Sequence, residues 1–181
     1  MRTRLTIFTF VIALVSASGA GAEARKDLQV FRDISDQVTS YTQFTIFDSV
    51  SASVVQGEVR LTGWVTMPYK KQDIERRVAR VDGVRAVRND IEVLPASPSD
   101  DALRFRIARA IYSHSAFWHY ASMAQPPIHI IVDRGRVTLA GVVLGDVDRL
   151  LARSLASGVG EFDVTNALKT DAEVRRALET S

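Results

Sequence analysis

An internal repeat constrains the fold of this chain more than any other feature of its sequence. Residues 57–65 and residues 135–143 both follow the pattern Gly-x-Val-x-Leu-x-Gly-x-Val. A second block, Gly-x-x-x-Val-x-Asn, follows each of them, at residues 83–89 and at residues 160–166. Because such self-similarity means that one structural unit occurs twice, the 181 residues are predicted to contain two copies of one small domain.

The domain boundaries follow from the repeat and from local composition. Residues 96–99 are rich in proline and serine and are predicted to be the linker between the copies. We therefore expect a first domain at residues 23–95, a second at residues 100–170, and a short helix or tail at residues 171–181. Each copy has only about 70 residues, which is marginal for a stable core, so the copies are expected to pack on each other.

Hydrophobic periodicity predicts the same order of elements in both copies: helix, strand, strand, helix, strand. The predicted fold class is therefore α+β, and each copy should contain a mixed three-stranded sheet covered on one face by two helices. The expected elements are residues 25–40, 50–54, 59–65, 68–83 and 87–93 in the first copy, and a helix from residue 98, then residues 128–132, 136–143, 146–157 and 162–169 in the second, followed by a helix-capping box at residues 170–173.

The composition excludes several classes of protein. The chain contains no cysteine, which rules out disulfide scaffolds, thiol catalysis, Cys-type zinc sites and acylation of an N-terminal lipoprotein cysteine. The 23 basic residues against 21 acidic ones give a net charge of +2, and Arg2 and Arg4 account for this excess. The rest of the chain is near neutral and lacks the basic footprint that nucleic-acid binding needs.

The first 22 residues have the organisation of a secretory signal peptide. Arg2 and Arg4 precede an apolar run at residues 5–15, and small residues follow as far as Ala22. This run is about half as long as the roughly 20 residues that a membrane-spanning helix needs. We therefore expect the segment to direct export and to be cleaved after Ala22.

The repeated hairpin pattern, the helix after it and the Gly-x-x-x-Val-x-Asn block together resemble the BON domain. The tandem arrangement behind a signal peptide is similar to that of two-BON envelope proteins of Gram-negative bacteria. This resemblance covers nearly all of residues 25–170. It implies two BON-like domains in a non-enzymatic periplasmic protein, associated with binding of phospholipid or envelope surfaces and with stress protection. Family members with a lipobox are tethered to the outer membrane, whereas this chain has no cysteine to acylate and is expected to be free in the periplasm.

No arrangement of residues in the sequence points to catalysis. His114, His119 and His129 are not spaced as metal ligands, so neither a metal nor another cofactor is expected. The sequence also lacks a Gly-x-Ser-x-Gly turn and the glycine motifs that bind phosphates or dinucleotides. Asp100 and Asp101 begin a helix, where carboxylates interact favourably with the helix dipole. This capping role is expected for them, and not that of a catalytic pair of acids. The prediction is a protein that is not an enzyme and takes no small-molecule substrate.

A basic patch is predicted on the second helix of the first copy and just after it. The alternative is a merely solvated helix face, because Asp73 lies three and four residues before two of the arginines, a spacing of ordinary surface ion pairs. The residues of this secondary basic patch are Lys70, Lys71, Arg76, Arg77 and Arg80.

The helix after Pro98 carries the principal predicted binding surface. Leu103, Ile107 and Ile111 form its buried stripe, and at about 100° per residue its remaining aromatic residues point the opposite way. Aromatic rings beside arginine suit a membrane interface that holds anionic headgroups. The alternative is that this face packs against the first copy. The predicted lipid- or partner-binding residues are Phe105, Arg109, Tyr112 and Trp118.

The sequence therefore predicts a periplasmic protein that binds anionic phospholipid or an envelope partner through its second copy. The alternative is a chaperone-like or protein-interaction module of the periplasm without lipid affinity. The expected partner is an anionic membrane surface or an envelope protein, and not nucleic acid.

Overall fold

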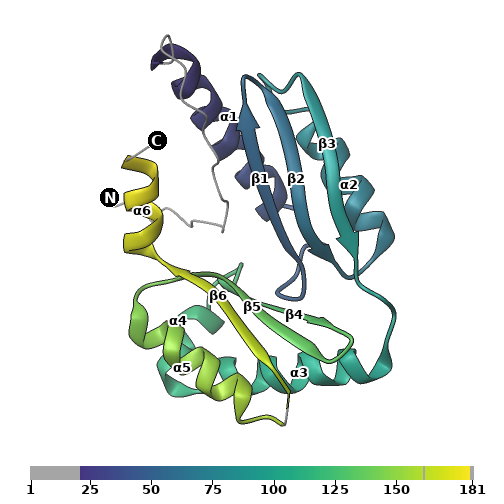
Figure 1. Cartoon of the computed structure of the whole chain (residues 1–181), viewed down its shortest axis with the longest axis vertical. Coiled ribbons are helices and arrows are strands. Elements are labelled where there is room, and N and C mark those ends of the chain that lie inside the picture. The colour runs from purple at the N-terminus through teal and green to yellow at the C-terminus, as the bar shows by residue number, and fades with distance from the viewer. Residues whose placement is uncertain (1–20, 161, 180–181) are drawn as a thin grey trace.

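The computed structural model describes residues 21–160 and 162–179, which form two α+β domains in tandem (Figure 1). Apart from residues 21 and 22, the predicted signal peptide lies outside the described residues. The elements of the first domain are α1 (Gly21–Thr39), β1 (Ser49–Val55), β2 (Glu58–Val65), α2 (Pro68–Val78) and β3 (Ala86–Val93). Those of the second are α3 (Pro98–Tyr112), η1 (Ser115–Phe117), α4 (Trp118–Ala121), β4 (Ile128–Asp133), β5 (Arg136–Val143), α5 (Asp146–Ser157), β6 (Val164–Thr170) and α6 (Asp171–Glu179).

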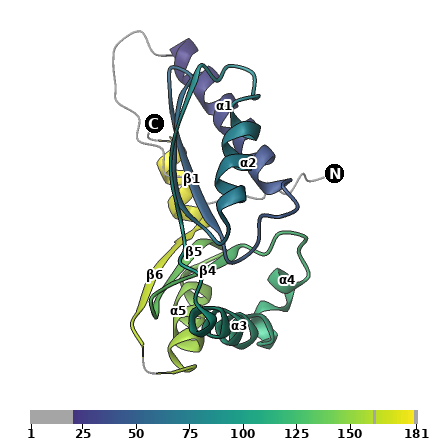
Figure 2. The ribbon, with the colours of Figure 1, turned by 90° about the vertical axis from the view of Figure 1, so that its right-hand side faces the viewer.

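Each domain contains a three-stranded mixed sheet. The first two strands form an antiparallel hairpin, and the third pairs in parallel with the middle strand. A parallel pair needs a crossover connection, which α2 and α5 supply. The helices α1 and α2 cover one face of the first sheet, and α3 and α5 cover one face of the second (Figure 2). The predicted order of helix, strand, strand, helix, strand is thus confirmed in both copies.

An aspartate on the first helix of each domain holds the hairpin turn. Asp27 accepts hydrogen bonds from the backbone N–H groups of Gln56 and Gly57, at 2.7 and 3.0 Å. In the second domain, Asp100 accepts from the N–H groups of residues 134 and 135, at 2.9 and 3.0 Å. The sequence predicts Asp100 only as a residue at the start of a helix. In the structure the carboxylate of Asp100 also ties α3 to the β4–β5 turn.

The short helices η1 and α4 were not predicted. They place Phe117 and Tyr120 in the core of the second domain, where the two rings stack with centroids 5.8 Å apart. The Tyr120 hydroxyl donates to Asp148 and accepts from the N–H of Leu144, each at 2.7 Å. These bonds fix α4 beside the start of α5.

The two domains pack on each other through the segment between α1 and β1. The carbonyl of Ile46 accepts a hydrogen bond from the N–H of Ile130 in β4 at 2.7 Å. Figure 1 shows the first domain on the side of the second sheet opposite to α3 and α5. Cover on one face was expected, but β4 and the end of β5 are buried on both faces, whereas the outer face of β6 stays exposed. His129, Ile131 and Val142 alternate with the residues that face the helices, and they too are buried.

The imidazole of His129 lies in this domain interface. Its ring centroid is 5.6 Å from that of Phe44, and the side chain is almost fully buried. Burial lowers the pKa of His129, while the backbone carbonyls of Asp48 and Thr45 and the charge of the Asp48 carboxylate oppose this effect. The packed domains therefore favour the neutral imidazole.

We expect the free energy of unfolding to decrease as the pH falls from about 7 to about 5. A histidine in the unfolded chain titrates near pH 6.5. Because the folded pKa of His129 is lower, the unfolded chain takes up the proton first, so this contribution is complete above that pH and is lost below it. Thermal melts at the two pH values measure the decrease, and His129→Gln should reduce it. An equal decrease in this variant would assign it to other groups.

Candidate functional site

The candidate site is the exposed face of α3. Ser97 caps this helix by accepting a hydrogen bond from the N–H of Asp100. Leu103, Ile107 and Ile111 are buried in the core of the second domain, as their spacing predicts. Packing therefore fixes one face of α3 and leaves the opposite face to solvent.

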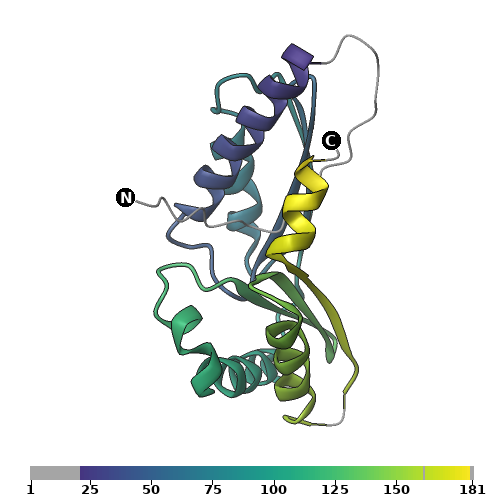
Figure 3. The same ribbon diagram turned by 90° about the vertical axis from the view of Figure 1, so that its left-hand side faces the viewer.

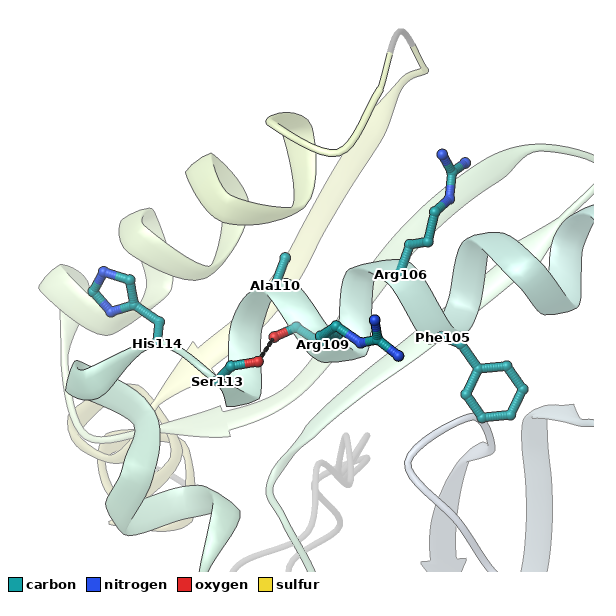
Figure 4. Close-up of a pocket in the computed structure, with 6 residues that line it drawn as sticks. All are labelled: Phe105, Arg106, Arg109, Ala110, Ser113 and His114. Carbon is teal, nitrogen blue, oxygen red and sulfur yellow. Dashed lines mark hydrogen bonds between the residues drawn. The ribbon is translucent and has the colours of Figure 1, made fainter.

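An open pocket with a volume of about 540 Å³ lies on the solvent-facing side of α3 (Figure 4). Arg106 and Arg109 line it from adjacent helical turns. Among the described residues, no carboxylate lies within ion-pair distance of either guanidinium. The pocket can therefore accept an anion. Its lining residues are Phe105, Arg106, Arg109, Ala110, Ser113 and His114.

Arg104, a third arginine of α3, has a structural role. Arg104 is buried, forms an ion pair with Asp101 and donates to the carbonyl of Val132. Its charge is used within the domain, whereas those of Arg106 and Arg109 are available for a ligand.

Two of the predicted aromatic residues are exposed. Phe105 has an exposed fraction of 63%, and its ring meets that of Phe47 edge-on with centroids 5.1 Å apart. Phe47 belongs to the first domain, so one edge of Phe105 lies at the domain interface and the rest is in solvent. Trp118 is 66% exposed, but it lies on α4 and does not line the pocket.

Tyr112 does not point away from the core, contrary to the prediction. Its hydroxyl donates to the carbonyl of Ile128 at 2.6 Å and accepts from the N–H of the same residue at 3.1 Å. The ring packs against the core of the second domain, and burial raises the pKa of the phenol. A position about 140° from Ile107 still lets a side chain as long as tyrosine reach the edge strand β4. The structure thus removes Tyr112 from the predicted binding face.

Lys70 does not belong to a surface patch, which corrects a second prediction. Its ammonium group is buried and donates to Asp48 at 2.7 Å and to the hydroxyl of Thr66 at 2.8 Å. Asp48 is fully buried and also accepts from the N–H and hydroxyl groups of Thr45 and Thr66. Five donors therefore compensate the desolvated carboxylate, as burial of a charge requires.

The other members of the secondary basic patch are only partly available to a ligand. Arg76 is paired with Asp73. The hydrogen bond from the Tyr41 hydroxyl, together with that from Arg76, lowers the pKa of Asp73. The guanidinium of Arg77 lies over the ring of Tyr41, with Cζ 4.7 Å from the centroid. The cations of this patch whose charged groups have no described partner are Lys71 and Arg80.

Sequence reasoning missed four of the pocket residues, Arg106 above all. The signal was present, because Arg106 lies next to Phe105 and three residues before Arg109, a spacing that brings side chains together on a helix. His114 gave no such signal, since it lies beyond α3. Its Nδ1 accepts from the N–H of Ala116 at 3.3 Å, which caps η1 and holds the ring at the end of the pocket.

Within residues 21–160 and 162–179, no cluster of three or more His, Asp or Glu side chains has the arrangement of a metal site. None of the described helices combines the length and apolar character needed to cross a bilayer.

Comparison with solved structures finds a distant similarity to CdsD of Chlamydia trachomatis, described as a structural protein of the type III secretion system. The C-terminal domain of CdsD is 14% identical, with a TM-score of 0.33, over 82% of this chain and 67% of that one. A second CdsD structure is 12% identical, with a TM-score of 0.30, over 83% of this chain and 97% of that one. No curated protein sequence matches.

A family model places the chain directly. The model of the BON domain matches twice, at residues 33–95 and at residues 99–172. Each match contains the two β-strands of a hairpin, the crossover helix and the third strand of one domain. The chain therefore belongs to the BON domain family and contains two BON domains in tandem.

Proposed function

We propose that this protein binds anionic phospholipid of the bacterial envelope through the exposed face of α3. The observation that carries the proposal is the pair Arg106 and Arg109, which line an open pocket without any acidic partner among the described residues. Guanidinium groups bind phosphate oxygens through paired N–H donors. The exposed ring of Phe105 adds an apolar contact at the level of the headgroups.

Membership of the BON family supports the class of function. BON domains are generally non-catalytic, and the family is consistent with a non-enzymatic, envelope-associated protein. We extend this to a protein free in the periplasm that takes part in protecting the envelope against stress. The signal peptide expected at residues 1–22 supports export to the periplasm.

The charge-reversed variant Arg106→Glu/Arg109→Glu tests the proposal. Sedimentation with vesicles of phosphatidylglycerol and phosphatidylcholine should show that the variant binds at least about 30-fold more weakly than the wild type, because each basic residue near an anionic surface contributes about 1 kcal/mol and the new carboxylates add repulsion. Its melting temperature should change little, since a solvated charge contributes at most about 1 kcal/mol to folding. Added salt should weaken the wild-type binding.

The matched control is Lys71→Glu/Arg80→Glu, which makes the same change of charge on the secondary basic patch. This variant should bind nearly as well as the wild type. Loss of binding in the control alone would move the site to the first domain. A wild-type protein that binds neither anionic nor neutral vesicles would refute lipid binding and favour the protein-interaction module.

A further inference from the structure

A group of large apolar side chains is exposed where β5 ends and α5 begins. Leu144, Val147 and Leu150 have exposed fractions of 63%, 78% and 64%. Ala152 faces the core and is fully buried, and at about 100° per residue Leu150 and Val147 lie about 160° and 140° from it. The helix therefore directs the side chains of Val147 and Leu150 into solvent, and Leu144 lies just before its first turn. We call the three residues the apolar edge.

The apolar edge has only a partial counterpart in the first domain, where Tyr69 is also exposed. The repeat aligns Val65 with Val143 and the buried Ile74 with the buried Ala152. In this alignment the residues of the first domain at the three positions of the edge are Thr66, Tyr69 and Gln72. The fold itself therefore does not require apolar side chains at these positions, and exposing three of them is unfavourable in water unless something covers them.

The surroundings of the apolar edge favour an anionic membrane as the cover. The helices α3 and α5 pack side by side, and Figure 4 shows α5 on the side of α3 from which Ala110 projects. The guanidinium groups of the pocket thus lie on the neighbouring helix. The carboxylates at the start of α5 are already engaged, because Asp146 is paired with Arg149 and Asp148 accepts from Tyr120.

The position in the molecule agrees with this occupant. Figure 3 shows α3, α4 and α5 at the end of the molecule away from the first domain. The exposed Trp118 belongs to α4, which is tied to the start of α5 through Tyr120. Apolar and aromatic side chains beside cations are the composition of surfaces that enter the headgroup region of a bilayer.

We propose that the apolar edge enters the outer part of the bilayer while the arginines of α3 hold anionic headgroups. This inference rests on the proposed function and adds a second, uncharged element to it. The arginines bring the second domain to the membrane, and burial of Val147 and Leu150 then retains it there. Binding should therefore fall only partly at high salt in the wild type.

A single engineered cysteine provides the test, because the chain contains none of its own. Leu150→Cys carries an environment-sensitive fluorophore, and the control Gln72→Cys carries it at the equivalent position of the first domain. On vesicles of phosphatidylglycerol and phosphatidylcholine, emission from position 150 should shift to the blue and be quenched by spin-labelled lipid. Emission from position 72 should not change. The unlabelled variant Val147→Ser/Leu150→Gln should bind about tenfold more weakly.

The outcomes separate this inference from the proposed function. If the wild type binds the vesicles while the label at position 150 stays in water and Val147→Ser/Leu150→Gln binds equally well, the apolar edge does not enter the bilayer. If the wild type fails to bind at all, both proposals fall. A blue shift that follows protein concentration and needs no vesicles would show instead that a second copy of the chain covers the edge.

Discussion

Replacing Asp48 by alanine should lower the free energy of unfolding by about 3–5 kcal/mol, because it leaves the ammonium group of Lys70 buried without its counter-charge. The loss extends beyond the ion pair. Asp48 also accepts from the N–H and hydroxyl groups of Thr45 and Thr66, which would lose an acceptor. Denaturant unfolding followed by circular dichroism measures the change.

The double variant Asp48→Ala/Lys70→Met distinguishes two causes of the lost stability. One is the unpaired buried charge of Lys70, and the other is the loss of the hydrogen bonds that Asp48 accepts. Removing both charges should restore part of the stability, since no uncompensated ion remains. Asp90→Ala is the surface control: this carboxylate pairs with Arg60 and Arg88 at an exposed site and should cost less than about 1 kcal/mol. Equal losses for Asp48→Ala and Asp90→Ala would contradict the assignment.

Alanine at the second glycine of each repeated motif should destabilise the domain that carries it by about 2–4 kcal/mol. Gly63 and Gly141 have φ values of +116° and +124°, where a side chain is strained. A Cβ atom would also lie 2.1 Å from the carbonyl oxygen of Ser49 in the first domain and 1.8 Å from that of Pro127 in the second. The partner strand would have to move, and the hairpin would lose part of its pairing.

Gly145→Ala is the matched control for these variants. Gly145 has an extended backbone, and no atom lies within 4 Å of the position that a Cβ would take. The melting temperature of Gly145→Ala should stay close to that of the wild type, whereas Gly63→Ala and Gly141→Ala should melt at clearly lower temperatures. If all three variants melted together, close approach of the strands would not be the reason for the repeated glycine.

Features that depend on neighbours in the sequence could be predicted well. The repeat and its periodicity placed every strand and long helix that the structure shows. The capping box at the last helix is also confirmed, because Thr170 and Glu173 each accept a hydrogen bond from the backbone N–H of the other. Such local hydrogen bonds need only a short spacing of the right residue types.

Features that depend on distant parts of the chain could not be predicted in the same way. Nothing near Lys70 in the sequence reveals that it lies buried beside Asp48. The sequence alone therefore predicts Lys70 on the surface. Tyr112 was placed by the helical repeat alone, which ignores how far a long side chain reaches. On the candidate site, Phe105 and Arg109 were placed correctly on the exposed face, and Arg106 was missed although it lies between them.

The sequence of β4 carries a signal of the domain interface. The strand β1 alternates small polar and apolar residues, whereas β4 runs Ile-His-Ile-Ile-Val with almost no polar interruption. A strand without alternation is buried on both faces. The comparison of the two copies therefore indicates which sheet the other domain covers.

The cover of the second sheet makes the two halves of the chain unequal as independent parts. The first domain, separated at the linker, would keep the solvated outer face that its sheet already has. The second, separated in the same way, would bring His129, Ile131 and Val142 into water and present the bare edge of β4, from which the N–H of Ile130 now bonds to Ile46. An exposed apolar edge strand of this kind promotes self-association. Separation would therefore expose buried sheet surface in the second domain, whereas the first would lose mainly the contacts of Phe44 and Phe47.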